Sequence, residues 1–427
     1  MKPRARAERL GVARAIAIVW LSIALMLGFR ITLAHAASPP VPLLEKGHPV
    51  DWWFVFKFNS AKFPECGADI NRQCPFGGEP ADYSSFGQQF VYASSESPSL
   101  RKGNDCVGDT TADPLGATFD EVYNGLFYYV IWNDQFYDDP VIAGCTRQCG
   151  SPWGHSKGML AWDDSGEGFV MQVTTPSWPA AGNKRFFRAT DGNTLGCVDD
   201  DNVKMSQHFF ALKLTRDDLI KVLSALQNAS VVTDPNKPQI VNNGGPPDVQ
   251  KVVKTLGVKS SSTTIVKANL SSGVELISKP SHLDVPPWQM VSALLGGISL
   301  RTATWWASPK IYSTTVSTEI GCWSDALATP GAVQIATTGK WEDAEFALTG
   351  GPSANGNHAK MGVSISGDHY YSIFGDMNQQ GTLSGPKCSS SQNGRGGLFY
   401  VIDNFTLSEE LKSLIAGGTA PTASPGR

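Results

Sequence analysis

The sequence has 427 residues, a formal net charge of −4 at pH 7 and few charged residues, 17% of the total. This length suits two ordinary domains or one large domain with two lobes. The negative net charge excludes a protein that attracts nucleic acid through its overall charge, so a polyanionic partner would need a local positive patch. The 43 glycines and the plentiful aromatic residues favour a β-rich extracellular protein over a helical cytosolic one.

The N-terminus has the three parts of a secretory signal peptide. A basic start is followed by a mostly apolar run from Ala15 to about Phe29, and Ala34-His35-Ala36 has the small-x-small pattern of a cleavage site. The run is short for a membrane span, which takes roughly 18 apolar residues; an uncleaved N-terminal anchor is the alternative. We expect residues 1–36 to be removed and the mature protein to be secreted or periplasmic.

The first half of the mature chain is expected to be rich in strands. Strands are predicted at 51–58, 121–133, 155–163, 168–174 and 209–214, where aromatic, β-branched and other apolar residues gather. Residues 61–115, rich in Gly, Ser, Pro and Cys, are expected to form loops. Thr215 can cap a helix of about twelve residues after the last of these strands, and acids follow it at the positive helix end.

Residues 228–250 are the best candidate for an interior linker, because Asn, Gly and Pro crowd there with little apolar content. Strand-like segments are predicted around 301–306, 332–337, 358–374 and 397–402, and helices at 288–295 and 406–416. The sequence thus predicts a mixed α/β protein with an N-terminal lobe at 37–235, a C-terminal lobe at 250–416 and a flexible tail at 417–427.

The eight cysteines predict disulfide bonds, because an even number in an exported chain is expected to pair. Cys145 and Cys149 resemble half of a zinc site, but no second such pair follows, so a disulfide is favoured. The simplest pairing joins Cys322 to Cys388 and leaves the other six to pair within the N-terminal half.

Two tripeptides about 200 residues apart carry the chemistry: His155-Ser156-Lys157 and His358-Ala359-Lys360. On a β-strand, residues two apart point to the same face. Brought together, the pairs would form a cationic site that can hold and cleave a phosphodiester. One imidazole can attack phosphorus, the other can protonate the leaving oxygen, and the ammonium groups can neutralise the phosphate.

A single such tripeptide is weak evidence, because a lone histidine beside a lysine is usually on the surface. Both copies, however, lie in glycine-rich, strand-like segments. A flanking ammonium repels a cation, so neither a metal nor a cofactor is expected. Asp163 and Asn378 follow the motifs as polar groups that can orient an imidazole or bind a phosphate oxygen.

The chain resembles the deoxyribonuclease II (acid DNase) family in a set of short segments that occur in the family's order. These are Gly47–Trp53, Trp132–Gln135, Gly154–Asp163, Thr174–Pro179, Cys197-Val198, Asn357–Lys360 and Gly375–Asn378. The resemblance implies a phospholipase D-like fold of two α/β lobes, with central β-sheets related by a pseudo-two-fold axis. It also implies a metal-independent endonuclease that favours acidic pH and leaves 3′-phosphate and 5′-hydroxyl ends.

The same resemblance implies a catalytic set of His155, Lys157, His358 and Lys360. His155 is expected to be the nucleophile and His358 the general acid, although the reverse stays open. Asp163 and Asn378 match supporting positions of the family. Residues Asp51, Asn133 and Asp134 match family motifs and are candidates for substrate contact, or equally for buried groups that fix loops.

Other candidates have a plainer alternative. The pair Trp305-Trp306 can stack on bases, but a core or subunit-interface role is favoured. Lys184, Arg185 and Arg188 form the compact basic cluster of the mature chain and can contact a DNA backbone. His48 is expected to be a loop residue and His208 a structural one.

The sequence also departs from the animal members of the family. The cysteine that precedes their first motif is absent, so the usual partner of the cysteine at Cys197 is missing, and residues 61–115 carry three extra cysteines. Their disulfide scheme therefore does not transfer. These departures favour a bacterial source.

Three functions remain open at this stage. The first is an exported endodeoxyribonuclease that acts on DNA through a phosphohistidine intermediate. The second is a phosphodiesterase of the same fold that acts on another substrate, such as a phospholipid. The third is a catalytically inactive, secreted DNA-binding protein. A homodimer would fit the family resemblance, and no membrane association is expected after signal cleavage.

Overall fold

The computed structural model describes residues 38–64, 74–79, 87–142, 144–145, 147–189, 192–198 and 203–423. The predicted signal peptide lies outside these residues, as does Cys66. No helix in the described part of the chain is both long and apolar enough to cross a membrane.

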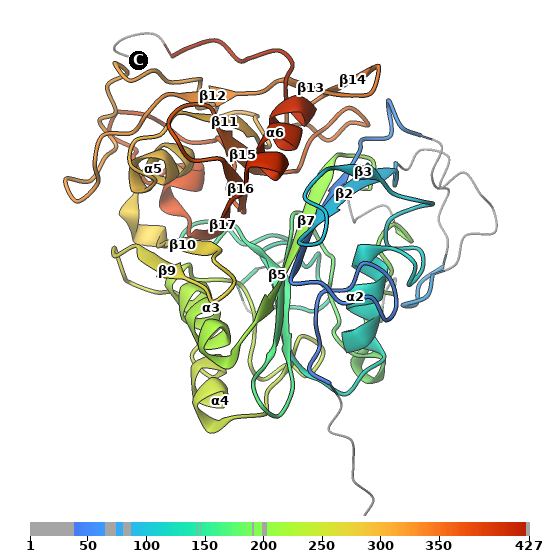
Figure 1. The fold of residues 1–427 in the computed structure, drawn as a ribbon. Helices are drawn as coiled ribbons and strands as arrows, with labels where there is room; N and C mark the ends of the chain where they lie inside the picture. The colour runs from blue at the N-terminus through green and yellow to red at the C-terminus, as the bar shows by residue number, and fades with distance from the viewer. Residues whose placement is uncertain are drawn as a thin grey trace, which may run out of the picture. The chain divides into compact units, whose positions relative to one another are not determined.

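The first half of the described chain forms an antiparallel sheet, drawn in blue to green in Figure 1. Its order is β3-β2-β1-β7-β6-β5-β4-β8, and all neighbouring strands run antiparallel. The strands are β1 (Trp52–Lys57), β2 (Phe90–Ser94), β3 (Arg101–Lys102), β4 (Tyr128–Asn133), β5 (Lys157–Trp162), β6 (Gly168–Val173), β7 (Gln207–Leu214) and β8 (Val241–Asn242).

The second half forms another sheet, in yellow to red, with the order β12-β11-β15-β16-β17-β10-β9. Its neighbours are antiparallel except for β11 and β12, which run parallel. The strands are β9 (Val266–Asn269), β10 (Glu275–Lys279), β11 (Leu300–Ala303), β12 (Val333–Ile335), β15 (Met361–Ser364), β16 (Tyr371–Gly375) and β17 (Gly397–Asp403), and β13 (Thr338–Trp341) pairs separately with β14 (Ala344–Ala347).

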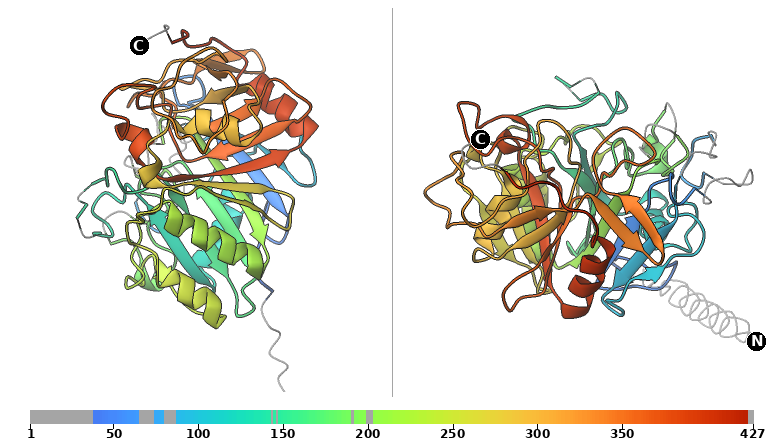
Figure 2. Two further views of the ribbon diagram at one scale, coloured as in Figure 1. Left: turned by 90° about the vertical axis from the view of Figure 1, so that its left-hand side faces the viewer. Right: turned by 90° about the horizontal axis from the view of Figure 1, so that it is seen from above.

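Five α-helices lie in the described residues: α2 (Pro114–Tyr123), α3 (Arg216–Asn228), α4 (Pro247–Val253), α5 (Pro287–Leu294) and α6 (Phe405–Leu414). The prediction that Thr215 caps a helix is confirmed, because its hydroxyl accepts from Asp218 N in a complete capping box. Helices α3 and α4 lie together against the first sheet (Figure 2, left), and α3 also contacts strands of the second sheet. The mixed α/β class is therefore confirmed.

Three of the predicted elements are wrong in detail. Residues 121–123 end α2 rather than begin a strand, because the Asp113 side chain caps this helix by accepting from Leu115 N and Gly116 N. The predicted loop at 61–115 contains β2 and β3. The helix predicted at 406–416 is α6 at Phe405–Leu414, and Asn404 caps it, since the Asn404 side chain accepts from Leu407 N.

The expected linker at 228–250 contains β8, which pairs with β4, and the first turn of α4. Its Asn, Gly and Pro residues form the turns that join these short elements. The division of the chain into two lobes at this segment stays a prediction.

The disulfide prediction for Cys322 and Cys388 is confirmed. Cys145 pairs with Cys149, so these thiols are not zinc ligands in this structure. Cys197 pairs with Cys74 from the predicted loop region, which supplies the partner that the animal pattern places elsewhere. Cys106 is also disulfide-bonded.

The two sheets share one hydrophobic core, in which Phe374 has a central place. Phe374 extends from β16 of the second sheet. Its ring stacks on Phe54 of β1 at a centroid distance of 4.6 Å and on Phe210 of β7 at 4.7 Å. Aromatic stacking of this kind adds to the free energy of burial, so this cluster fixes the second sheet against the first.

We expect Phe374→Ala to lower the free energy of unfolding by about 3–5 kcal/mol, because it removes a fully buried ring and leaves a cavity between the sheets. Denaturant titration would measure the loss. Phe405→Ala is the matched control, since Phe405 is 59% exposed and should change stability by about 0.5 kcal/mol or less. Equal effects of the two variants would contradict this view of the core.

Candidate active site

Backbone hydrogen bonds hold each motif histidine next to the opposite sheet. His155 lies two residues before Lys157, the first residue of β5, and its N–H donates to Gly396 O at 2.8 Å, just before β17. His358 lies shortly before β15, and its N–H donates to Ser206 O at 2.7 Å, just before β7. The motifs are therefore at strand starts rather than within strands, and each is attached to the other half of the chain.

Two glycines allow this close approach on the His155 side. A Cβ atom on Gly154 would lie 2.5 Å from Ala229 O, and one on Gly396 would lie 2.2 Å from the same oxygen. No side chain fits at either position without moving the backbone. The end of α3 thus presses on the two segments that hold His155.

The Nδ1 atoms of both imidazoles bind backbone carbonyls at strand ends of the opposite sheet. His155 Nδ1 is 2.7 Å from Asp376 O, directly after β16, and His358 Nδ1 is 3.1 Å from Thr174 O, directly after β6. A carbonyl oxygen only accepts, so Nδ1 carries the proton in each ring. In the neutral ring, Nε2 then has a free lone pair for attack or proton transfer.

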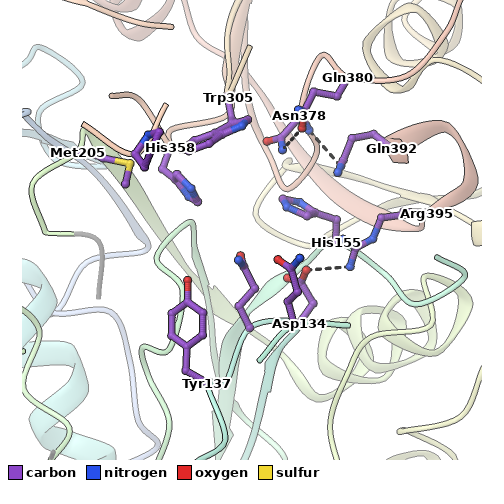
Figure 3. A pocket seen from close by; sticks show the side chains of 13 residues that line it. Asp134, Tyr137, His155, Met205, Trp305, His358, Asn378, Gln380, Gln392 and Arg395 are labelled. Atoms are coloured by element: carbon purple, nitrogen blue, oxygen red, sulfur yellow. Dashed lines mark hydrogen bonds and ion pairs between the residues drawn. The ribbon is translucent and has the colours of Figure 1, made fainter. Parts of the chain in front are cut away.

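Both histidines line one cavity of about 340 Å³ (Figure 3). Polar side chains form most of its wall, together with Tyr137, Met205 and Trp305. The lining residues are Asp134, Gln135, Tyr137, Gln148, His155, Met205, Trp305, Pro352, His358, Asn378, Gln380, Gln392 and Arg395. The structure therefore brings the two distant motifs to a single site.

The two motif lysines are buried behind the cavity and do not line it. Lys157 Nζ is 2.6 Å from Asp134 Oδ1, and the other carboxylate oxygen accepts from Arg395 Nη2 at 2.8 Å. Lys360 Nζ donates to His358 O at 2.5 Å. One carboxylate thus serves two cations, so the site keeps an excess of positive charge.

Burial and this charge lower the pKa values of both imidazoles and so disfavour their protonation in the free protein. Burial lowers the pKa of His155 well below 6.5; Asp134 opposes the shift, and Lys157 adds to it. Burial, Lys360 and Lys157 lower the pKa of His358 in the same way. Burial also lowers the pKa values of Lys157 and Lys360.

The pKa values of the two carboxyl groups near the site, Asp134 and Asp376, shift in opposite directions. Burial raises the pKa of Asp134, but the nearby cations Lys157 and Arg395 outweigh it, so the net shift is downward and the group is a stable anion. Burial raises the pKa of Asp376 to about 7, although Ser156 and Leu398 N stabilise its charged form. Asp376 also accepts from Gln172 Nε2 at 3.1 Å, which joins the two sheets behind the site.

The other predicted site residues divide into two groups. Asn378 and Asp134 line the cavity. Asp163 instead lies after the far end of β5, where it accepts from Ser165 N. Asp51 lines a separate pocket, and Asn133 is buried with its side chain bound to backbone groups of Thr175 and Gln135.

The aromatic pair and the basic cluster are each split by the structure. Trp305 lines the cavity with its ring 4.5 Å from that of His358, whereas Trp306 is buried in the core. Lys184 and Arg185 are exposed, but Arg188 is buried and donates to Ser177 O. The prediction that Arg188 belongs to a compact basic surface is therefore wrong.

Arg395 and Tyr137 are among the cavity residues that were not predicted from the sequence. Arg395 lies among glycines just before β17. Such glycines indicate a segment whose backbone packs closely against another part of the chain, here Ala229. Tyr137 lies in the left-handed region at φ +52°, an unfavourable conformation that often marks functional sites. The guanidinium of Arg147 lies 5.1 Å from the Tyr137 ring centroid.

His208 is fully buried, in keeping with the structural role expected for it. Its Nδ1 accepts from Lys360 N at 3.1 Å, so His208 fixes the backbone of the His358-Ala359-Lys360 motif. His48 is bound to Glu96 on the surface. Among the described residues, no group of three or more His, Cys, Asp or Glu side chains is arranged to hold a metal ion.

A polar cavity with two imidazoles, a guanidinium and two lysines behind them is suited to a phosphate ester, and this points to the class of hydrolases that act on such esters. The comparison with protein families agrees with this. The family profile described as Deoxyribonuclease II matches residues 42–419, nearly the whole chain. The chain belongs to the deoxyribonuclease II family, which supports a deoxyribonuclease function with DNA as substrate. A search of curated proteins found no match.

We expect Asp134→Asn to lower the free energy of unfolding by about 3 kcal/mol, because it leaves Lys157 and Arg395 buried without their anion. Thermal or denaturant unfolding would measure the loss. Asp248→Asn is the control, since it removes a carboxylate from the exposed pair with Arg216 and should leave stability unchanged. An unaffected Asp134→Asn protein would show that this ion pair does not support the site.

Proposed function

We propose that the protein is an exported, metal-independent endodeoxyribonuclease that cleaves DNA through a phosphohistidine intermediate. The observation that carries the proposal is the common cavity of His155 and His358, each with Nδ1 fixed to a carbonyl. This leaves both Nε2 atoms for one substrate. The family membership supports DNA as that substrate.

In the first step, neutral His155 Nε2 attacks phosphorus and the bond from phosphorus to the 5′-oxygen breaks. Protonated His358 gives its Nε2 proton to that oxygen, which leaves as a 5′-hydroxyl. In the second step, His358 takes a proton from water, the water oxygen attacks phosphorus, and the bond to His155 Nε2 breaks. The products carry 3′-phosphate and 5′-hydroxyl ends, and both histidines return to their initial states.

The positive side chains have the charge that this reaction needs. Arg395 lines the cavity, and Lys157 and Lys360 lie directly behind the two histidines. Their charge can stabilise the phosphorane-like transition state, in which negative charge grows on the non-bridging oxygens. Trp305 and Tyr137 offer aromatic faces beside this position for the flanking bases.

Matching contacts in the two halves support a phospholipase D-like pseudo-two-fold arrangement. The order β1-β7-β6-β5-β4 in the first sheet corresponds to β10-β17-β16-β15-β11 in the second. The two Nδ1 bonds correspond to each other, as do the two histidine N–H bonds. In addition, Leu398 N donates to Asp376 Oδ2, while His208 N donates to Thr174 Oγ1.

Export is supported by the disulfide bonds, which form and persist in oxidising compartments. The signal peptide, a bacterial source and a homodimer remain predictions of the sequence.

The nuclease proposal is tested by plasmid digestion in the presence of a chelator, with the product ends mapped. His155→Ala and His358→Ala should each lower the cleavage rate by at least about 10³-fold, because each removes a group that takes part in both steps. His369→Ala is the control, since His369 is exposed and paired with Asp403. A requirement for magnesium, or 5′-phosphate ends, would contradict the mechanism.

The pH dependence follows from the lowered pKa values of both imidazoles. The general acid must hold a proton that burial and the lysines disfavour, so its protonated fraction grows as pH falls. A bound phosphodiester adds negative charge and raises the pKa of the imidazole next to it. Because this pKa belongs to the substrate-bound protein, we expect kcat to rise as pH falls from about 8 to about 5, and to fall again once the nucleophile is protonated. A rate that rises steadily toward alkaline pH would exclude this assignment.

A further inference from the structure

Two lysines outside the histidine motifs are fully buried at equivalent places. Lys57 is the last residue of β1 and Lys279 is the last residue of β10. Lys57 Nζ donates to Gly87 O at 2.6 Å, Val203 O at 2.6 Å and Met205 O at 2.5 Å, and lies 3.2 Å from Phe58 O. Lys279 Nζ donates to Asn393 O at 2.7 Å and Arg395 O at 2.9 Å, and lies 3.3 Å from Pro280 O.

All of these acceptors are backbone carbonyls and, apart from Gly87 O, they occupy the same positions in the two halves. Val203 and Met205 come four and two residues before β7, and Asn393 and Arg395 come four and two residues before β17. Each ammonium therefore fixes one short segment that leads into a central strand.

The residue that directly follows each of these segments binds a motif histidine. Ser206, directly after Met205, accepts the N–H of His358, and Gly396, directly after Arg395, accepts the N–H of His155. The same segments place Met205 and Arg395 in the cavity wall. The link crosses between the sheets, because Lys57 of the first sheet leads to His358 and Lys279 of the second sheet leads to His155.

A buried ammonium is an expensive way to fill space, since apolar side chains of similar volume are usually as stable or more so. At Lys279, burial lowers the pKa of the ammonium group to about 7. What an ammonium adds is several N–H donors on one atom, which can hold several carbonyls in a fixed arrangement. A methionine of similar length can fill the space but cannot hold them.

We propose that Lys57 and Lys279 are positioning residues of the active site, Lys57 for His358 and Lys279 for His155. This inference rests on the proposed function for its kinetic consequences. The lysines act through the backbone, so small shifts of the clamped segments displace the imidazoles.

The kinetic test uses Lys57→Met and Lys279→Met in the full mature protein. We expect each to lower kcat for duplex DNA about 10–100-fold with KM changed by about twofold or less, because a displacement of one ångström can cost that much. Val55→Ala in β1 and Leu276→Ala in β10 are the matched controls. Both are fully buried, so they should lower the melting temperature and leave kcat nearly unchanged.

A substrate that needs no general acid separates the two lysines. In a duplex with sulfur in place of the 5′-bridging oxygen at one linkage, the leaving thiolate departs without a proton. In a single turnover that follows release of the thiol, and so reports the first step alone, Lys57→Met, which disturbs the general acid His358, should cleave that linkage within about threefold of the wild-type rate, whereas Lys279→Met, which disturbs the nucleophile, should stay impaired. Recovery of both variants, of neither, or of Lys279→Met alone would overturn the assignment.

A readout independent of activity distinguishes this inference from the proposed function. With ¹⁵N-labelled histidine, Lys57→Met should shift the ring resonances of His358 and leave those of His155, and Lys279→Met should do the reverse. If the wild-type protein does not cut DNA, the proposed function fails, and these shifts still decide the positioning roles.

If the methionine variants do not fold, Lys57→Gln and Lys279→Gln keep two N–H donors for the same comparison. Folded variants with unchanged kcat and unchanged ring resonances would show that the lysines are structural only.

Discussion

The site depends on the exchange of hydrogen bonds between the strand ends of one sheet and the histidines of the other. Each motif histidine donates two hydrogen bonds to backbone carbonyls of the opposite half, one from its main-chain N–H and one from its Nδ1. Four carbonyl oxygens therefore set the position and the tautomer of both rings. Because these carbonyls belong to the ends of central strands, the packing of the two sheets determines the geometry of the site.

The electrostatics follow from the same arrangement. Burying two imidazoles, two lysines and an arginine around one strongly anionic carboxylate, Asp134, leaves a site with surplus positive charge. That surplus is unfavourable in the free protein and favours a bound phosphodiester. Asp376 is the second carboxylate of the site, and burial raises its pKa to about 7, so it adds little negative charge under acidic conditions. In the mechanism that we propose, acid conditions therefore suit both the protonated imidazole and the phosphate-binding charge.

Much of the site could be predicted from the sequence, because its histidines and lysines stand in short motifs with a clear chemical meaning. The convergence of His155 and His358 followed from the hypothesis that both motifs serve one substrate. Asp163 was wrongly predicted as a supporting residue of the first motif. The site lies at the start of β5, and the six residues of that strand separate Asp163 from it. Arg395 was missed because its role depends on a loop that precedes β17, and no local pattern connects it to Asp134, which lies 261 residues earlier.

The fold was predictable where local rules dominate and less so elsewhere. The capping box at Thr215 and the apolar run of β17 are local signals, and both elements form as expected. The last three residues of α2 were predicted to begin a strand because Val122 and Tyr123 also suit strands, whereas they continue a helix that Asp113 caps. The pairing of Cys74 with Cys197 depends on chain positions 123 residues apart, so spacing could not reveal it.

The most direct measurement of the central claim is rapid quenching of the protein with labelled DNA, followed by mapping of any phosphoryl group on the protein. The account predicts a transient, acid-labile phosphoryl group on Nε2 of a single motif histidine, His155, that is absent from the His155→Ala variant. Cleavage that proceeds at full rate with no phosphohistidine at any time, or with the label on a residue outside the cavity, would contradict it.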